Sequence, residues 1–256
     1  MTGAIYMTPV GHFRRTVGRQ GTLVLASGAI IRTPALCIPT NLMAIPHLTR
    51  DMFDQVLDKE RCLIQVYYED LWEHPRVVRA LPIPFKRYAN LEGYSVILSL
   101  KEDRYFCKLD GFNLLNGSDF VNAVNTAGVI KLSMGELGEI MDRIEADGYV
   151  IPVDHYPLPG TAKRIKKSME RSGKYEAALS SHDKTIPSLV TPNHGNNLSN
   201  TGSQPMIAIS GNSINDAQSV LDTIPLSNDQ CRYWRGRLDI EGLRIVLNSG
   251  KVDIVD

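Results

Sequence analysis

The chain has 256 residues with 28 basic and 28 acidic side chains, so its formal net charge at pH 7 is zero. Proteins that mainly bind nucleic acid usually carry an excess of basic residues, so any contact with a polyanion has to come from a local patch. Apolar residues make up 43% of the chain, which is enough for a substantial core and argues against wholesale disorder. A single α/β barrel commonly has this length, although two small domains would also fit.

The cysteines and the apolar runs indicate in which cellular compartment the protein is expected. The four cysteines are far apart and form no CxxC pair, so they predict neither a zinc site nor a disulfide framework and favour a reduced, intracellular protein. No apolar run has the eighteen or so residues of a membrane span, and no signal-peptide core is present. Residues 1–20 contain three arginines and no acid, as a mitochondrial presequence does. We expect a cytoplasmic protein, with association with mitochondria as the alternative.

In the first half of the chain, apolar runs alternate with helical patterns. Residues 22–25 and 29–31 flank Ser27-Gly28 and predict a hairpin. Residues 101–125 are polar and rich in Gly and Asn, which predicts an excursion from the core. The other elements predicted here are strands over 35–38, 63–67 and 95–100, a helix capped by Thr49 with Met52, Phe53, Val56 and Leu57 on its apolar face, and a short helix over 76–81.

The clearest helix signal begins at Ser133. Ser133 and Glu136 have the spacing of a capping box, in which each side chain bonds a free amide at the start of the helix. Gly148 is expected to stop this helix. Its apolar face is predicted to consist of Leu137, Ile140, Met141 and Ile144.

The stretch from Tyr149 to Leu179 combines a strand, an acid, a loop and a basic helix. Asp154 directly follows the apolar run 149–153, and a turn rich in Pro and Gly comes next. This order is typical of one βα unit, and the residue at the carboxyl end of a parallel strand usually faces the site of chemistry. Asp154 is therefore the first candidate site residue. The alternative is a carboxylate that only caps the turn or the following helix.

The helix after Asp154 is strongly basic, with one acid, Glu170, in its first part. Ile165, Met169 and Ser172 are predicted to face inward. A basic run on a helix is most often a solvated face. Its position beside the predicted site makes phosphate binding the alternative. The basic residues are Lys163, Arg164, Lys166, Lys167, Arg171 and Lys174.

The last part of the chain begins with residues 180–205, which are rich in Ser, Thr, Asn, Gly and Pro and predict a long flexible loop. Only the short run Ser188-Leu189-Val190 within it could be a strand. A strand over 206–209 and helices over 213–224 and 239–248 follow. The final strand, 252–256, has no following segment to cover it, although a parallel strand needs helices on its faces. The alternation of strands and helices predicts the α/β class.

Several stretches, in order, resemble the tRNA-guanine transglycosylase family, whose members exchange a guanine in the tRNA anticodon for queuine or a precursor. The similarity is greatest to the accessory, non-catalytic subunit of the eukaryotic queuine tRNA-ribosyltransferase, and Pro46-His47-Leu48-Thr49 is its most specific piece. The resemblance implies a TIM-type (β/α)8 barrel over residues 1–256 as a single domain, incomplete at its C-terminus. The similar stretches are TPALCIPTNLMAIPHLTRDMF, residues 123–154, KRIKKSMERS, MIAISGN and residues 231–256.

Base exchange in this family is a double displacement, in which a carboxylate attacks the sugar carbon and a second acid handles the proton. The resemblance places Asp256 at the position of the nucleophile and Asp154 where the base is held. Ser210 and Gly211 stand where the family has a Gly-Gly loop beside the base. The proton-handling aspartate belongs to a DSGG turn. That turn corresponds to residues 89–94, where Asn90 has an amide that cannot act as a general base.

These departures imply a chain that is not an enzyme by itself. We expect an accessory subunit that forms a heterodimer with a catalytic queuine tRNA-ribosyltransferase subunit and helps to position tRNA or queuine. Lys163, Arg164, Lys166 and Lys167 are the candidates for contacts with tRNA phosphates. The family's zinc site, three cysteines and a histidine, lies beyond its late catalytic strand, so the resemblance implies neither a metal nor another cofactor in this chain.

Two alternatives remain open at this point. The chain could be an active transglycosylase that uses Glu92 or Glu102 in place of the missing aspartate. It could instead be an unrelated barrel enzyme or an inert fragment. Exchange of labelled guanine into tRNA by the isolated chain favours the first, and binding to neither tRNA nor a transglycosylase subunit favours the second.

Overall fold

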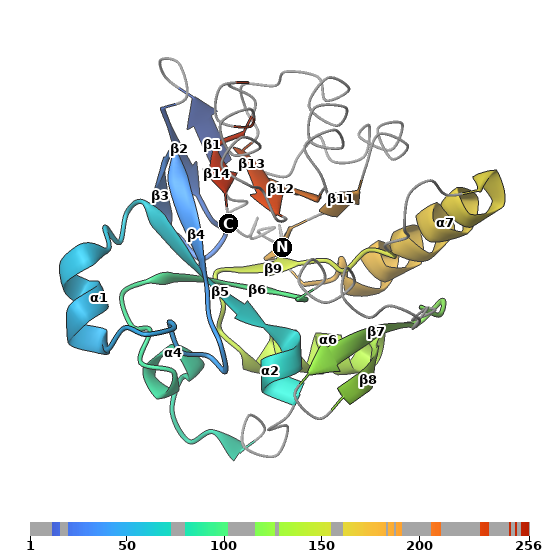
Figure 1. Cartoon of the computed structure of the whole chain (residues 1–256), viewed down its shortest axis with the longest axis horizontal. Coiled ribbons are helices and arrows are strands. Elements are labelled where there is room, and N and C mark those ends of the chain that lie inside the picture. The colour runs from blue at the N-terminus through green and yellow to red at the C-terminus, as the bar shows by residue number, and fades with distance from the viewer. Residues whose placement is uncertain are drawn as a thin grey trace, which may run out of the picture.

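The structure is a computed structural model of the whole chain. Its described elements form an α/β fold, in which a large parallel sheet is flanked by helices and accompanied by small antiparallel sheets (Figure 1). The described residues are 12–15, 20–72, 80–101, 116–125, 128–154, 161–182, 184–186, 188–190, 206–210, 231–235, 246, 249 and 252–255.

The large sheet has nine strands in the described part of the chain, and every neighbouring pair is parallel. The strands are β4 (Ala35–Pro39), β5 (Cys62–Tyr67), β6 (Ser95–Ser99), β9 (Gly148–Val150), β10 (Thr185–Ile186), β11 (Ser188–Val190), β12 (Met206–Ser210), β13 (Cys231–Arg235) and β14 (Ile254–Val255). Their order in space is β10-β9-β6-β5-β4-β14-β13-β12-β11.

The two ends of this sheet are neighbours along the chain. β10 stops at Ile186 and β11 starts at Ser188, so a single residue separates the two edge strands. β10 also contacts β12, the neighbour of β11. The sheet therefore curls. The last strand, β14, lies inside it, with Ile254 paired to Ala35 of β4 on one side and to Tyr233 of β13 on the other.

One hydrophobic cluster lies on the inner side of the curled sheet. Successive side chains of a strand point to opposite faces, so each strand sends alternate residues inward. A small antiparallel sheet leads directly into β4 and covers its amino end. It consists of the hairpin β2 (Gly21–Val24) and β3 (Ile30–Thr33), extended by β1 (His12–Arg15). The buried members of the cluster are Leu23, Leu25, Ile31, Ala35, Cys37, Leu63, Ile97, Val150, Ile186, Met206, Cys231, Tyr233 and Ile254.

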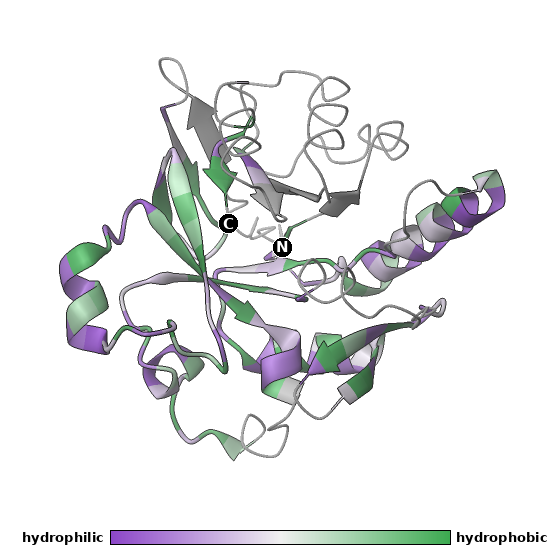
Figure 2. Ribbon diagram, viewed as in Figure 1, coloured by the Kyte–Doolittle hydropathy of each residue, from purple (hydrophilic) through white to green (hydrophobic). Residues whose placement is uncertain are grey.

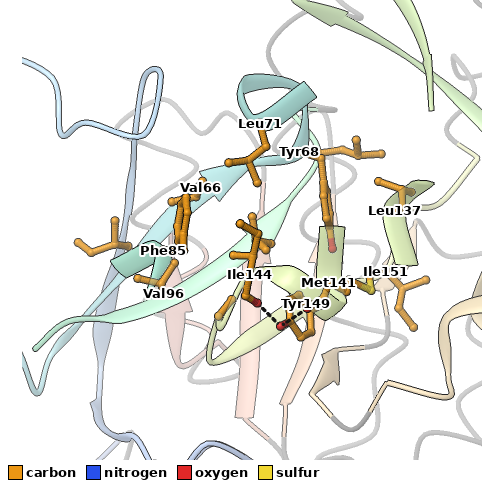
Figure 3. Close-up of a cluster of buried hydrophobic side chains, with 14 of the residues drawn as sticks. Val66, Tyr68, Leu71, Phe85, Val96, Leu137, Met141, Ile144, Tyr149 and Ile151 are labelled. Atoms are coloured by element: carbon orange, nitrogen blue, oxygen red, sulfur yellow. Dashed lines mark hydrogen bonds between the residues drawn. The ribbon is translucent and has the colours of Figure 1, made fainter. Parts of the chain in front are cut away.

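A second cluster lies between the outer face of the sheet and the helices (Figures 2 and 3). Tyr149 of β9 is part of it, and its hydroxyl bonds the carbonyl of Met141 at 2.8 Å and also that of Ile144. Burial raises the pKa of Tyr149 to about 12, so the phenol stays protonated and remains a donor. The helices are α1 (Arg50–Val56), α2 (Tyr68–Trp72), α4 (Phe85–Tyr88), α6 (Met134–Arg143) and α7 (Ala162–Leu179).

The capping box at Ser133 is confirmed. The Glu136 amide donates to Ser133 Oγ at 3.2 Å, and the Ser133 amide donates to Glu136 Oε2 at 2.9 Å. Gly148 does not stop this helix, which ends at Arg143. Gly148 is instead the first residue of β9, where an added Cβ atom would come within 2.6 Å of Ile186 Cδ1. The close approach of β10 to β9 explains the glycine.

The helix predicted after Thr49 is α1, but two details of the prediction were wrong. The Thr49 hydroxyl caps no backbone amide and donates to Asp51 Oδ1 at 2.6 Å. Phe53 is buried, whereas Met52 and Val56 are 48% and 67% exposed. The helix has only seven residues and one buried side chain, so it buries a smaller apolar face than the four residues predicted.

Other predicted segments are only partly within the described residues. The excursion over 101–125 contains β7 (Phe120–Asn125), which pairs antiparallel with β8 (Gly128–Ser133). Residues 180–205, where we expected a long loop in which the run 188–190 could be a strand, contain β10 and β11. β11 is the strand over 188–190, whereas β10 was not predicted. Residues 191–205 lie outside the described part, as do the helices predicted over 213–224 and 239–248, except for the helical Val246. Only Ala80 and Leu81 of the helix predicted over 76–81 are described, and of these Ala80 is helical. In the described chain, no helix is long and apolar enough to span a membrane.

Candidate functional site

Asp154 lies at the carboxyl end of β9, four residues beyond Val150, and its side chain is fully buried. Both carboxylate oxygens are bonded. Oδ1 accepts from Asn116 Nδ2 at 2.9 Å and from Arg164 Nη2 at 3.2 Å, and Oδ2 accepts from Arg171 Nη1 at 3.1 Å. Asp154 is therefore more than a cap for the following turn, because it binds groups from two other segments of the chain.

The basic helix α7 supplies most of these partners. Its N-cap is Thr161, whose hydroxyl accepts from the Arg164 amide at 3.3 Å. Arg164 and Arg171 are seven residues apart, which is two helical turns, so both guanidinium groups reach the same carboxylate. Their side chains are 24% and 23% exposed. The two arginines together with Asp154 form what we call the arginine clamp.

Two serines on the same face bond the backbone of Asp154. Ser172 Oγ accepts from the Asp154 amide at 3.0 Å, and Ser168 Oγ donates to the Asp154 carbonyl. Of the predicted inward residues, Ile165 and Met169 are only half-buried. The face of α7 that meets Asp154 therefore includes Arg164 and Arg171 and differs from the predicted apolar face. A buried carboxylate is stable only when cations and hydrogen-bond donors compensate its charge.

Asn116 connects the arginine clamp to the β7–β8 hairpin. Its Nδ2 donates to Asp154, and its Oδ1 accepts from the Asn122 amide of β7 at 2.9 Å. The Tyr175 hydroxyl of α7 donates to the Gly117 carbonyl at 2.6 Å. The hairpin lies beside α7 (Figure 1). These bonds fix Asp154, α7 and the hairpin relative to one another.

The clamp determines what Asp154 can do chemically. Ionised carboxylates offer about four lone-pair directions, and three are used by N–H donors here. With the clamp closed, Asp154 is suited neither to proton transfer nor to direct contact with a ligand.

The exposed basic residues of α7 are those that the clamp does not use. Lys163, Lys166 and Lys167 are exposed, whereas Arg164, which we expected with them on phosphates, bonds Asp154. Figure 2 shows polar and apolar residues mixed along α7. A polyanion would meet the lysines of this helix and not its arginines.

Three other candidates follow strands that run parallel to β9. Ser210 is the last residue of β12 and so is at the carboxyl end of the sheet, as Asp154 is. Asp256 comes directly after Val255 of β14 in the sequence. Gly211, Asp256 and the side chain of Ser210 lie outside the described residues.

Asn90 is at the opposite end of the sheet. It precedes the start of β6 at Ser95 by five residues, and β6 pairs in parallel with β9, which Asp154 follows. The backbone of Asn90 is left-handed, with a φ of 57°, and its side chain is exposed. The structure therefore does not bring Asn90 to Asp154. Glu92 is exposed at the same end as Asn90, and Glu102 lies outside the described residues.

Arg50 holds the turn that contains Asn90. Its Nη1 donates to the Asn90 carbonyl at 2.6 Å and its Nη2 to the Glu92 carbonyl at 2.7 Å. Its guanidinium also lies 5.2 Å from the ring centroids of Phe53 and Tyr94. Arg50 thus joins the start of α1 to residues 90–94.

Replacing Arg50 with alanine is expected to loosen this turn and to lower the free energy of unfolding by about 1 kcal/mol, because two charge-assisted bonds from a mostly buried side chain are lost. Urea denaturation measures the loss, and hydrogen exchange at Tyr94 reports the turn. Arg61→Ala is the control, since its ion pair with Asp58 is more than half exposed on both sides and is expected to contribute little. Equal losses in the two variants contradict the role of Arg50.

A polar cluster at the carboxyl ends of β5 and β6 was missed in the sequence. Gln65 and Ser99 follow Leu63 and Ile97 by two residues, so they point to the same inner side of the sheet. Gln65 Nε2 donates to Ser99 Oγ at 2.7 Å, and the Tyr67 hydroxyl donates to Gln65 Oε1 at 3.2 Å. All three side chains are buried. The signal was present, since each strand carries a polar residue within an apolar run.

A buried ion pair beside this cluster holds a tight turn after β4. Asp70 pairs with Lys101, and its Oδ2 accepts from the Leu42 amide at 2.9 Å. Leu42 and Met43 have positive φ values of 49° and 68°, which Asn and Gly adopt most easily. Such strain persists only where the surroundings enforce it. Asp70 contributes to this through its bond to the Leu42 amide, together with the two backbone bonds between Asn41 and Ala44.

In the part of the chain that the structure describes, no three His, Cys, Asp or Glu side chains lie close enough to hold a metal ion. A scan against models of protein families and a search of curated proteins found no match for this chain.

Proposed function

We propose that this chain is a non-catalytic accessory subunit of a tRNA-guanine transglycosylase, acting beside a catalytic queuine tRNA-ribosyltransferase subunit in the queuosine modification of tRNA anticodons. The observation that carries the proposal is the arginine clamp. The resemblance puts the substrate base at Asp154, and there Arg164 and Arg171 already bond both carboxylate oxygens. A chain whose own arginines occupy the position of the substrate base is suited to an accessory role and not to catalysis.

The strand order supports the barrel that the resemblance implies. If β10 and β11 are one strand interrupted at residue 187, the nine strands become eight. Their spatial order then follows the chain from β4 to β14 and returns to β4, which is the order of a TIM-type (β/α)8 barrel. In such barrels, sites form at the carboxyl ends of the strands, where Asp154 and Ser210 occur.

The position of Asn90 argues against independent catalysis. A double displacement needs a nucleophile and an acid or base at the same sugar. The resemblance puts the nucleophile at Asp256, the residue after β14 in the sequence, whereas Asn90 and Glu92 precede β6 at the amino end of the sheet. In addition, Asn90 has no group that can take up a proton.

A role in holding tRNA fits the outer face of α7. Lys163, Lys166 and Lys167 are exposed at successive turns near the start of the helix, and α7 starts seven residues after Asp154 in the chain. Exposed lysines bind phosphates without reading sequence. A subunit that binds the tRNA backbone would let the catalytic partner act on the anticodon base.

Co-purification with the catalytic subunit of the same organism tests the proposal. We expect a stable complex on size-exclusion chromatography and no exchange of labelled guanine into tRNA by this chain alone. A catalytic subunit carrying a disrupted partner-binding surface is the matched control and should not retain the chain. Failure to form a complex, or exchange by the isolated chain, overturns the accessory role.

A further inference from the structure

The β7–β8 hairpin has two edges, and hydrogen bonds on β7 show which backbone groups point outward. The Asn122 amide donates to Asn116 Oδ1 at 2.9 Å. The Phe120 carbonyl accepts from the Tyr175 hydroxyl of α7 at 3.1 Å. Neither group bonds β8, and along an antiparallel strand such residues alternate with residues that bond the partner strand. Alternate residues of β7, beginning at Phe120, therefore point their amides and carbonyls away from β8.

The edge of β8 follows from the same alternation. Its residues Ser133, Lys131 and Val129 pair with Phe120, Asn122 and Val124. Residues opposite each other in an antiparallel pair share one orientation, so the amides and carbonyls of Lys131 and Val129 point away from β7. The Ser133 amide points the same way and donates to Glu136 Oε2. In the described part of the chain, no group bonds the outward amides and carbonyls of Lys131 and Val129.

This edge of β8 is accessible. Val129 is 51% exposed, and Lys131 is exposed as well. α7 bonds the β7 side of the hairpin, and β8 lies on the far side from it (Figure 1). An outward lysine usually keeps other strands away from an edge. Here the Lys131 ammonium group lies 3.8 Å from the centroid of the Phe120 ring, so the side chain is folded back over its own hairpin.

We propose that the β8 edge at Val129 and Lys131 is a docking site for an extended, acidic segment of another protein, which adds to the hairpin as an antiparallel strand. In complexes of this kind, backbone bonds to an exposed edge supply affinity and alternate side chains supply specificity. The added strand bonds the outward amides and carbonyls of both residues. The proposal does not depend on the proposed function, because it needs neither tRNA nor a catalytic subunit.

The side chains of β8 indicate which residues the added strand carries. An acid opposite Lys131 forms a cross-strand pair of opposite charge, whereas a lysine there is repelled. The next residue faces Ile130, which is partly buried against the second hydrophobic cluster, so an apolar side chain fits. A β-branched residue fits opposite Val129. Residues 128–133 contain no acid, so a second copy of this strand does not supply the charge that Lys131 favours.

Fluorescence anisotropy with the whole chain and a blocked, labelled peptide of sequence TEIVT tests the proposal. Its glutamate is designed to lie opposite Lys131 and its valine opposite Val129. We expect saturable binding with a Kd below about 1 mM. The peptide TKIVT should bind at least about fivefold more weakly, because it opposes two like charges. TEIVT that is N-methylated at the glutamate and valine amides should not bind, because it cannot donate to the carbonyls of β8.

Substitutions at Lys131 provide the matched controls. Lys131→Glu should reverse the preference, so that TKIVT binds more tightly than TEIVT. Lys131→Pro removes an outward amide without breaking a bond to β7, so circular dichroism should show a folded chain, and neither peptide should bind. Lys166→Glu makes the same change of charge at an exposed position of α7 and should leave peptide binding unchanged.

The proposal is overturned if the folded chain does not bind TEIVT, if the two peptides bind equally, or if Lys131→Glu leaves the preference unchanged. Binding that persists after N-methylation also contradicts it, because backbone bonds are then not used. Dimerisation of the chain that Lys131→Pro abolishes would show that a second copy occupies the edge instead. None of these outcomes involves tRNA or the catalytic subunit, so they are distinguishable from failure of the proposed function.

Discussion

Replacing Asp154 with alanine is expected to lower the free energy of unfolding by about 3 kcal/mol, because it removes the buried carboxylate that two mostly buried arginines share. The Arg164 and Arg171 guanidinium groups would then face each other across the vacated position. Asn116 would lose its acceptor as well, which frees the hairpin from α7. Urea denaturation followed by circular dichroism measures the change.

Two controls separate the clamp from a general loss of charge. Asp119→Ala removes an exposed carboxylate from the hairpin region and should change stability by less than about 0.5 kcal/mol. Removing all three charged groups, with Arg164→Met and Arg171→Met added to Asp154→Ala, should restore part of the loss, because an absent buried charge needs no partner. A triple variant less stable than Asp154→Ala contradicts this account of the clamp.

Replacing Asp70 with alanine is the second large effect, with an expected loss of about 3 kcal/mol. The carboxylate is 1% exposed and the Lys101 side chain is 10% exposed, so the variant leaves an unpaired ammonium group in a largely buried place. The Leu42 amide also loses its acceptor. We expect the turn over residues 41–44 to relax from its left-handed backbone.

Hydrogen exchange at the Leu42 amide distinguishes this local effect from global destabilisation. Exchange there should rise more in Asp70→Ala than in Leu63→Ala, a core variant of similar cost that leaves the turn untouched. Asp70→Asn retains one acceptor oxygen and should lose less stability than Asp70→Ala. If the Leu42 amide exchanges equally in the two alanine variants, Asp70 does not hold the turn.

Much of the fold could be predicted because its elements have strong local signals. β4, β5 and β6 are apolar runs bounded by turn residues, and the Ser133–Glu136 box marks the start of α6 unambiguously. β11 was indicated only as a possible strand over 188–190, and β10 has two residues, too few for a periodic pattern. Their conformation depends on the neighbouring strands β9 and β12, which a local pattern cannot reveal.

The candidate site was predictable in position but not in its contacts. The order of strand, acid, loop and helix was enough to predict Asp154 as a site residue. A basic residue on a helix is normally assigned to solvent, so Arg164 and Arg171 were expected on the outer face and are on the inner one. Asn116 precedes Asp154 by 38 residues and belongs to a segment without a clear pattern. Contacts over such distances in sequence arise from the fold as a whole.

Guanine exchange into tRNA by the combined subunits tests the central claim most directly. The rate is measured for the catalytic subunit alone, for this chain alone, and for the two mixed in equal amounts with labelled guanine. The account predicts no exchange by this chain alone and a mixture faster than the catalytic subunit alone. A mixture no faster than the catalytic subunit, or exchange by this chain in isolation, contradicts it.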